Sequence, residues 1–366
     1  MTRKRVLTRC RLLAMTMLVS TSGAAATSTG CGKTLASGIY QMKDQHVART
    51  YRVFVPSRYQ PGVAYPLVMV FHGWGGDENE FLDDKTVTTL ADERGYIVVA
   101  PRGLGSAAPD SNRNSWSFRG STTGLAGAPE GVITHPPGGA GAICDVARTP
   151  DFTYPSCRNV ARNSCSWTQC QADDVAFTLA LVKEVESEGC VDTTRVFASG
   201  GSNGGMFTWE LGQNAASAPT FRAIASLIGL PHHGYLDTPA KPGGMPVLVI
   251  TGMHDTTVPP GAWEGINYTT TSDGSAYYYT GATAIMRRWG TANSCPYIGK
   301  PAAPFKTGID QADCRTYCGD NAQGWSGGVA GAGWPHVLDC RATMGHEYDF
   351  RWTWKLILDF FDAQSR

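Results

Sequence analysis

The sequence predicts an α/β protein built on a mostly parallel central sheet flanked by helices. Two apolar runs, "YPLVMVFHG" from residue 65 and "YIVVAP" at residues 96–101, are typical of strands that are buried on both faces. The segment between them has the length and the ends of a helix. A strand, a helix and a strand at this spacing form the unit from which parallel sheets are built.

The other elements follow in a regular order. Apolar and polar residues alternate in "RTYRVFVP", residues 49–56, which predicts a half-buried strand. The segment at residues 77–95 starts with acidic residues and ends in Gly95, as helices do, so we expect a helix there. The same patterns later predict strands at residues 195–199, 221–229 and 245–252, and amphipathic helices at residues 171–189 and 349–361.

Two cysteine-rich segments interrupt this order, at about residues 103–170 and 293–340. Both are also rich in Gly, Pro and Ser. Loops of this length inside a compact domain are usually functional or disordered, but disulfides can hold them in place. We therefore expect two loop insertions over the loop end of the sheet, within one catalytic domain that covers residues 31–366.

The charge balance narrows the choice of partners. Of 366 residues, 31 are Lys or Arg and 31 are Asp or Glu, so the chain has no overall field that would attract nucleic acid or an anionic membrane. A hydrophobic content of 42% is enough for a full core. We expect a neutral or weakly charged small molecule or polymer as the partner, with no nucleic acid and no membrane.

The first 26 residues are typical of a secretory signal peptide. The basic stretch "MTRKRVLTRCR" precedes the short apolar core "LLAMTMLVSTSG", and Ala24 to Ala26 supply the small residues that a signal peptidase requires. The apolar core is too short to remain as a membrane anchor. The sequence therefore predicts a secreted, extracellular protein.

The cysteine count agrees with secretion. Of 11 cysteines, Cys10 lies in the predicted signal peptide, and the ten that remain can pair completely in an oxidising compartment. Sequence alone does not give the pairing. A zinc site is the alternative for "CRTYC" and for Cys165 with Cys170, but the usual CxxC pairs and His-x-His partners are missing. We expect neither a metal nor a cofactor.

The stretch "RVFASGGSNGGMFTWELG" carries the strongest functional signal. Gly200-Gly201-Ser202-Asn203-Gly204 fits the pattern G-x-S-x-G, with a predicted strand before it and a predicted helix after it. In such a turn, glycines beside the serine leave room where backbones pass close together. The serine hydroxyl then projects from the carboxyl end of the strand as a candidate nucleophile. The alternative is a glycine-rich turn of purely structural use.

A serine nucleophile requires a base that is itself oriented by a carboxylate, in the chain order Ser, Asp or Glu, His. Asp255 in "MHDTTVP" follows a predicted strand, where the acid belongs, although a capping or turn role is the alternative. His346 stands just before the last helix, and Gly345 before it allows a close approach. We expect Ser202, Asp255 and His346 to form a catalytic triad. His346 is expected to be the base in preference to the alternatives His232, His233, His254 and His336.

The loop after the first buried strand is the expected source of an oxyanion donor. "FHGWGG", residues 71–76, is similar to the HG-x-G loops of esterases, in which a backbone N–H faces the nucleophile. Trp74 is the expected donor, with Gly73 as the alternative, and the N–H of Asn203 is the second donor. Gly73 is also expected to line the substrate site, whereas His72 is expected to have a structural role.

Six motifs together resemble one family. "GCGKTL", "YRVFVP", "YPLVMVFHGWGG", "DDVAF", "GGSNGGM" and "GMHDTTVP" are similar to secreted esterases of the polyhydroxybutyrate depolymerase and feruloyl esterase type, in the esterase D-like branch of the α/β-hydrolases. The likeness runs from about Cys31 to the end of the chain and is weak inside the two insertions. It implies an α/β-hydrolase fold and the same triad. Tannase-type feruloyl esterases have cysteines where this chain has Gly201 and Gly345, which disfavours that branch.

The substrate is expected to be a carboxylic ester. The resemblance implies feruloyl esters of plant cell-wall polysaccharide or, alternatively, polyhydroxybutyrate or another polyester. Among aromatic residues near the insertions, Trp116 is the first candidate to stack on a hydroxycinnamoyl ring, with packing beneath a loop as the alternative role. A serine peptidase and a non-catalytic binding protein are the rival classes. The other aromatic candidates are Trp167, Trp325 and Trp334.

Overall fold

The computed structural model describes most of the chain after the predicted signal peptide. The described residues are 26–44, 47–105, 113–126, 141–264, 270–272, 276–295, 302–318 and 334–364. The predicted signal peptide, residues 1–26, lies outside them except for Ala26.

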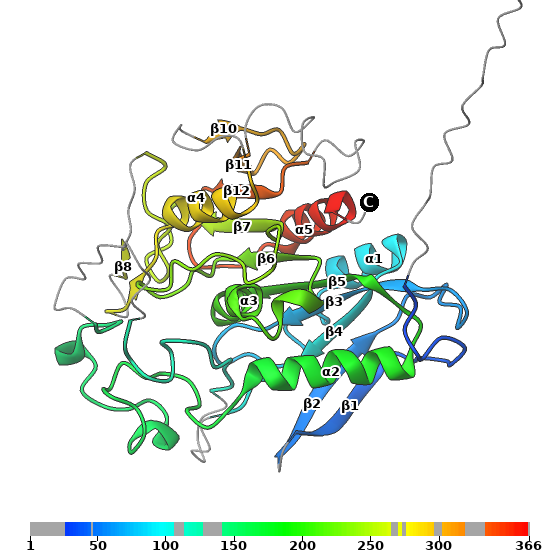
Figure 1. Ribbon diagram of the computed structural model, residues 1–366, viewed down its shortest axis with the longest axis horizontal. Coiled ribbons are helices and arrows are strands. Elements are labelled where there is room, and N and C mark those ends of the chain that lie inside the picture. The colour runs from blue at the N-terminus through cyan, green and yellow to red at the C-terminus, as the bar shows by residue number, and fades with distance from the viewer. Residues whose placement is uncertain are drawn as a thin grey trace, which may run out of the picture.

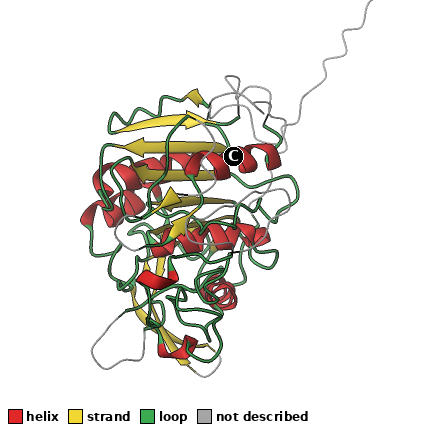
Figure 2. Cartoon of the chain, turned by 90° about the vertical axis from the view of Figure 1, so that its left-hand side faces the viewer, coloured by secondary structure: helices red, strands yellow, loops and turns green. Residues whose placement is uncertain are grey.

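One twisted sheet of ten strands organises these residues, in the order β1-β2-β4-β3-β5-β6-β7-β12-β11-β10 (Figure 1). The central run from β4 to β12 is parallel, and the outer strands on both sides pair antiparallel. In Figure 2 the strands at one end of the sheet cross those at the other end at a steep angle, as the right-handed twist of sheets requires. The strands are β1 (Gly38–Asp44), β2 (Val47–Phe54), β3 (Tyr65–Phe71), β4 (Ile97–Pro101), β5 (Val191–Gly201), β6 (Ala223–Leu227), β7 (Val247–Gly252), β10 (Ala303–Pro304), β11 (Ala312–Thr316) and β12 (Val337–Ala342), and β8 (Thr270–Thr271) and β9 (Tyr278–Tyr279) form a separate pair.

Helices cover both faces of the sheet and divide its core in two. Side chains of α2, α3 and α4 belong to one buried cluster, and those of α1 and α5 belong to the other. None of the helices in the described part of the chain is long and apolar enough to cross a membrane. The α-helices are α1 (Lys85–Arg94), α2 (Asp174–Glu188), α3 (Asn203–Gln213), α4 (Ala282–Ala292) and α5 (Phe350–Gln364).

The predicted α/β fold is confirmed, with one helix shorter than expected. The helix expected over residues 77–95 begins only at Lys85, after a series of turns. The Asp84 side chain accepts the backbone N–H groups of Thr86 and Val87 and so caps the helix at that point. Gly95 ends the helix in the left-handed conformation, as the sequence predicts.

The second cysteine-rich segment differs from the expectation. Instead of lying as a loop over the sheet, its described residues add β10, β11 and β12 to the edge beyond β7. β12 pairs parallel with β7 and so belongs to the central sheet itself. The prediction missed these strands because the surrounding residues are rich in Gly, Pro and Cys. It also missed β1 and α4.

All ten cysteines of the predicted mature chain are paired. Cys31–Cys190 joins the start of the chain to the residue before β5. Two disulfides lie within the first cysteine-rich segment and two within the second, where one of them joins β11 to β12. The four are Cys144–Cys165, Cys157–Cys170, Cys295–Cys318 and Cys314–Cys340.

Candidate active site

Ser202 occupies the turn between β5 and α3. Its backbone has φ 51° and ψ −117°, a positive φ that residues other than glycine rarely adopt. The glycines around it have no room for a side chain. A Cβ on Gly200 would lie 2.5 Å from the Gly204 backbone, and one on Gly204 would lie 2.1 Å from the carbonyl oxygen of Phe71. The glycines therefore permit the tight turn that holds the half-buried serine at the carboxyl end of β5.

Ser202, His346 and Asp255 form a continuous hydrogen-bonded chain. His346 Nε2 lies 2.8 Å from Ser202 Oγ, and His346 Nδ1 lies 2.7 Å from Asp255 Oδ2. The three residues come from separate segments, after β5, between β12 and α5, and after β7. The structure therefore brings together the three side chains that the sequence pattern selects.

Asp255 is held from two sides. Its Oδ1 accepts the backbone N–H groups of Thr257 and Val258, each at 2.8 Å. Its side chain is fully buried, whereas that of His346 is 24% exposed. With Oδ1 occupied in this way, Oδ2 faces Nδ1 of the imidazole. This arrangement favours the tautomer with the proton on Nδ1, which leaves Nε2 free to accept the Ser202 proton.

The segment that carries His346 packs closely against the end of β7. A Cβ on Gly252 would lie 2.4 Å from the carbonyl oxygens of Met344 and Gly345. At Gly345 itself, a Cβ would meet nothing within 4 Å. The expected close approach is therefore real, but the glycine that permits it is Gly252.

The other described histidines do not take the place of His346. His232 Nε2 accepts from the Trp167 indole at 2.8 Å, and burial lowers the pKa of His232 to about 3. Burial likewise lowers the pKa of His233 and of His336 to about 4, and His254 is exposed. His72 is buried as expected, with Nε2 accepting the Gly103 N–H at 2.9 Å.

The two segments expected to supply oxyanion donors both lie near Ser202, since a Cβ on Gly73 would lie 3.6 Å from the Ser202 Cβ and Asn203 follows Ser202 directly. Asn203 starts α3, where the first backbone N–H groups have no partner inside the helix. The Gly73 N–H already donates to Glu80 Oε1 at 2.8 Å. Gly73 is therefore wrong as the alternative donor, and Trp74 stays the prediction for this loop.

Trp116 does not have the exposure that a substrate-stacking role requires. Its side chain is 0% exposed. The ring stacks on Phe207, with centroids 5.6 Å apart, and meets Phe71 edge-on. Its indole N–H donates to the carbonyl of His72 at 3.1 Å. The expectation that Trp116 binds substrate is therefore wrong, because the ring is fully buried and packs against other aromatic side chains.

The side chain of Asn203 explains why Trp116 lies so deep. Asn203 Oδ1 accepts the Trp116 N–H at 2.8 Å, and its Nδ2 donates to the Trp116 carbonyl at 3.1 Å. This part of the first cysteine-rich segment is thereby fixed to the start of α3. Of the other aromatic candidates, Trp167 and Trp334 are half-buried and Trp325 lies outside the described residues.

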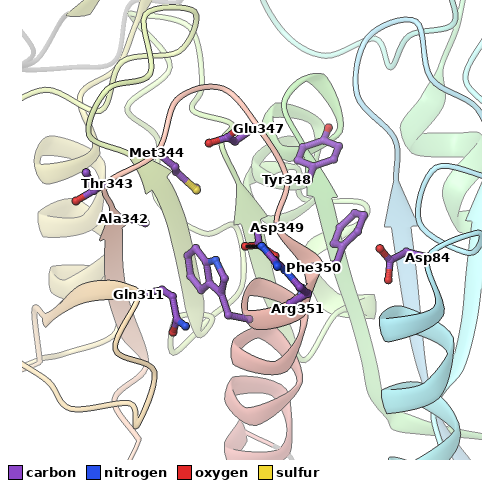
Figure 3. Close-up of a pocket in the computed structure, with 11 residues that line it drawn as sticks. Asp84, Gln311, Ala342, Thr343, Met344, Glu347, Tyr348, Asp349, Phe350 and Arg351 are labelled. Atoms are coloured by element: carbon purple, nitrogen blue, oxygen red, sulfur yellow. Dashed lines mark hydrogen bonds and ion pairs between the residues drawn. The ribbon is translucent and has the colours of Figure 1, made fainter.

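Two side chains that belong to no motif lie beside this centre. Glu80 accepts the Gly73 N–H, and Tyr348 contacts the glycines on both sides of the site. In Figure 3, the loop between β12 and α5 carries Met344 on one side and Tyr348 on the side nearer Asp84. Both residues line a hollow of about 570 Å³. Sequence reasoning missed both residues because neither stands at a recognisable spacing from the triad.

No group of three His, Cys, Asp or Glu side chains among the described residues could hold a metal ion. The chemistry available at this centre is that of a serine hydroxyl, an imidazole and a carboxylate, with backbone N–H groups beside them.

Comparisons with known proteins bear on the class of reaction. No protein-family model matches the chain. A probable feruloyl esterase C from Aspergillus flavus is 24% identical over 294 residues, which cover 79% of this chain and 78% of that protein. The corresponding protein of Aspergillus clavatus is 25% identical over 302 residues, 81% of each chain. Feruloyl esterase B from Piromyces equi is 29% identical over 176 residues, 45% of this chain and 31% of that protein.

Among solved structures, an acetyl xylan esterase from Aspergillus awamori covers 89% of this chain and 99% of its own, at 14% identity and a TM-score of 0.48. At that level the likeness does not bear on function. The relatives found by sequence do bear on function, and they confirm the resemblance that the motifs indicate. The chain is an α/β-hydrolase similar to feruloyl esterases, and it is a carboxylic ester hydrolase.

Proposed function

We propose that this hydrolase is a secreted serine esterase that cleaves feruloyl and related hydroxycinnamoyl esters of plant cell-wall polysaccharide. The observation that carries the proposal is the chain of hydrogen bonds from Asp255 through His346 to Ser202, at 2.7 and 2.8 Å. Such a chain activates a serine hydroxyl for attack on a carbonyl carbon.

In the proposed reaction, His346 Nε2 takes the proton of Ser202 as Oγ attacks the ester carbonyl. The N–H groups of Asn203 and Trp74 stabilise the tetrahedral oxyanion. The alcohol leaves with the proton from His346, and an acyl-enzyme remains on Ser202. Water then attacks by the same steps and releases the acid. Asp255 keeps the imidazole oriented and stabilises its cation.

The substrate class is supported by the relatives, which are named feruloyl esterases. The sequence motifs also resemble polyhydroxybutyrate depolymerases, so a polyester is the comparison substrate. Secretion is supported by the basic and apolar N-terminus and by the five disulfides, which persist in oxidising compartments.

The test is turnover by the purified mature chain on methyl ferulate and feruloylated arabinoxylan, against amorphous polyhydroxybutyrate, with Ser202→Ala as the blank. We expect the hydroxycinnamates to be cleaved faster and the Ser202→Ala variant to be inactive. Faster release from the polyester would make the enzyme a depolymerase instead. Full turnover by a folded Ser202→Ala variant would contradict the triad assignment.

Two further readouts address the rival classes. A fluorophosphonate probe should label the wild type and leave Ser202→Ala unlabelled. A non-catalytic binding protein would not be labelled in either form. Casein should remain uncut under conditions that hydrolyse methyl ferulate, whereas a serine peptidase would degrade it.

A further inference from the structure

Glu80 and Tyr348 lie where three active-site segments meet. Glu80 Oε1 accepts the Gly73 N–H at 2.8 Å, on the loop after β3. Tyr348 stands two residues after His346, and its hydroxyl is hydrogen-bonded to the Glu80 carboxylate. The two side chains therefore join the loop of the expected oxyanion donor, Trp74, to the segment that carries the base.

Tyr348 also touches the segment that carries the nucleophile. A Cβ on Gly201, the residue before Ser202, would lie 2.3 Å from the Tyr348 hydroxyl oxygen. A Cβ on Gly73 would lie 2.6 Å from the same oxygen. The end of this one side chain thus rests against two backbones at once, and both positions must be glycine for it to fit.

The loop after β3 closes around the Glu80 carboxylate. A Cβ on Gly76 would lie 2.1 Å from Glu80 Oε2, while Oε1 holds the Gly73 N–H. Trp74 lies between Gly73 and Gly76 in the chain, so the Glu80 carboxylate borders the loop on both sides of it.

In the Tyr348–Glu80 hydrogen bond, the tyrosine is the donor. Burial and the nearby Glu80 charge raise the pKa of Tyr348 well above its ordinary value, so the phenol stays protonated and donates. Burial also raises the pKa of Glu80, and the charge of Asp77 acts in the same direction. The Glu80 carboxylate accepts the Gly73 N–H and the Tyr348 O–H, and both hydrogen bonds lie beside the candidate active site.

We propose that Glu80 and Tyr348 are positioning residues, which hold the loop after β3 so that the Trp74 N–H faces the oxyanion formed at Ser202. Neither side chain needs to contact the substrate for this role. The inference rests on the proposed triad and oxyanion donors, but it is independent of which ester is the natural substrate.

A positioning role and a purely structural role give different kinetics. A donor aimed at the oxyanion acts mainly in the transition state, so its displacement lowers kcat and leaves KM nearly unchanged. A packing defect lowers the stability of the protein and the amount of folded enzyme, without a selective effect on the transition state. Transition-state analogues distinguish the two, since their affinity follows kcat/KM.

The experiment compares Glu80→Ala, Glu80→Gln and Tyr348→Phe, with hydrolysis of 4-nitrophenyl acetate and affinity for a boronic acid as readouts. Loss of one oxyanion donor costs about 10²–10³ in kcat, so we expect about a 100-fold loss for Glu80→Ala. For Tyr348→Phe, which keeps the Gly73 contact, we expect roughly a 10-fold loss. Glu80→Gln can still accept the Gly73 N–H, so it should recover most of the activity.

Tyr96→Phe is the matched control. The Tyr96 hydroxyl donates to Asp362 at 2.7 Å, so this variant also removes a tyrosine–carboxylate hydrogen bond, but one that is remote from the site. It should keep the wild-type kcat and the wild-type boronic acid affinity.

The proposal is overturned if Glu80→Ala and Tyr348→Phe keep the wild-type kcat, or if their losses appear in KM with kcat unchanged. It is also overturned if Glu80→Gln is no more active than Glu80→Ala in a folded protein. An active Ser202→Ala variant would instead contradict the proposed triad, whatever the Glu80 variants do.

Discussion

The carboxylate of Asp255 divides its two oxygens between the backbone and His346. Oδ1 accepts the N–H groups of Thr257 and Val258, and Oδ2 lies 2.7 Å from His346 Nδ1. In an Asp255→Asn variant, the amide oxygen can keep the two backbone contacts, which turns the NH₂ group toward Nδ1. The imidazole would then adopt the wrong tautomer, and we expect kcat to fall by about 10⁴ with little change in the melting temperature. Steady-state kinetics and thermal unfolding of the same preparation check this, and a loss below about tenfold would contradict it.

Trp116→Phe separates packing from substrate binding. Because the buried Trp116 ring packs against both Phe71 and Phe207, we expect the change to leave a cavity and to reduce the free energy of unfolding by about 1–3 kcal/mol. The ratio of kcat/KM for methyl ferulate to that for methyl acetate should stay within about threefold of the wild type. Urea denaturation and the two rate measurements test this. A selective loss on ferulate would restore Trp116 as a substrate-binding residue.

Asn203→Ala should destabilise the protein. The substitution leaves the buried N–H and carbonyl of Trp116 without the side-chain partners that now lie at 2.8 and 3.1 Å. Each unsatisfied buried group costs about 1–3 kcal/mol, so for the two groups we expect a total loss of about 2–6 kcal/mol. Chemical denaturation gives the value. Asn203→Asp is the informative comparison, since its oxygen can still accept the Trp116 N–H but cannot donate to the carbonyl. A stability equal to that of the wild type in both variants would show that these hydrogen bonds are unimportant.

Acid should destabilise the folded chain through His72. Its Nε2 accepts the Gly103 N–H, and burial lowers its pKa to about 4, from an ordinary value of 6.5. Between these two pH values the unfolded chain binds a proton that the folded chain does not, so the free energy of unfolding falls as the pH falls from about 6.5 to 4. A shift of this size corresponds to about 3 kcal/mol.

The measurement is the free energy of unfolding of wild type and His72→Gln from pH 7 to pH 4. The glutamine oxygen can still accept the Gly103 N–H and does not titrate, so the variant should lose less stability over this range. Parallel curves for the two proteins would show that His72 does not cause the acid sensitivity.

The disulfides should differ in how much each contributes to the free energy of unfolding. In the chain-entropy model, closing a longer loop removes more freedom from the unfolded chain. Cys31–Cys190 spans 159 residues and Cys157–Cys170 spans 13. Replacing both cysteines by serine should therefore cost about 5 kcal/mol for the first pair and about 3 kcal/mol for the second. Thermal and urea unfolding of the two double variants test the order. A larger loss from the shorter loop would mean that local packing dominates.

The sequence was most informative where function depends on local pattern. Ser202 lies between a strand and a helix, within a cluster of glycines, and Asp255 follows a strand of continuous apolar residues. Those signals extend over fewer than about ten residues, the range over which periodicity and turn chemistry act. The central strands and the helices of the sheet were predictable for the same reason.

Contacts between distant segments were not predictable. Trp116 stands in a polar, loop-like stretch, and its burial depends on Phe207 and Asn203, which lie about 90 positions later in the chain. Glu80 acts on a backbone N–H seven residues earlier, across a turn that no motif encodes. β12 was hidden by its cysteine-rich surroundings, because its place in the sheet depends on pairing with the distant β7 rather than on composition alone.

The positive φ of Ser202 has a consequence for how the protein can be improved. A non-glycine residue in such a conformation costs of order 1–3 kcal/mol, which glycine would largely avoid. Ser202→Gly should therefore yield a dead enzyme that is more stable than the wild type. Screens that reward only heat resistance would drift toward this loss, so selection for a robust catalyst must measure turnover alongside survival.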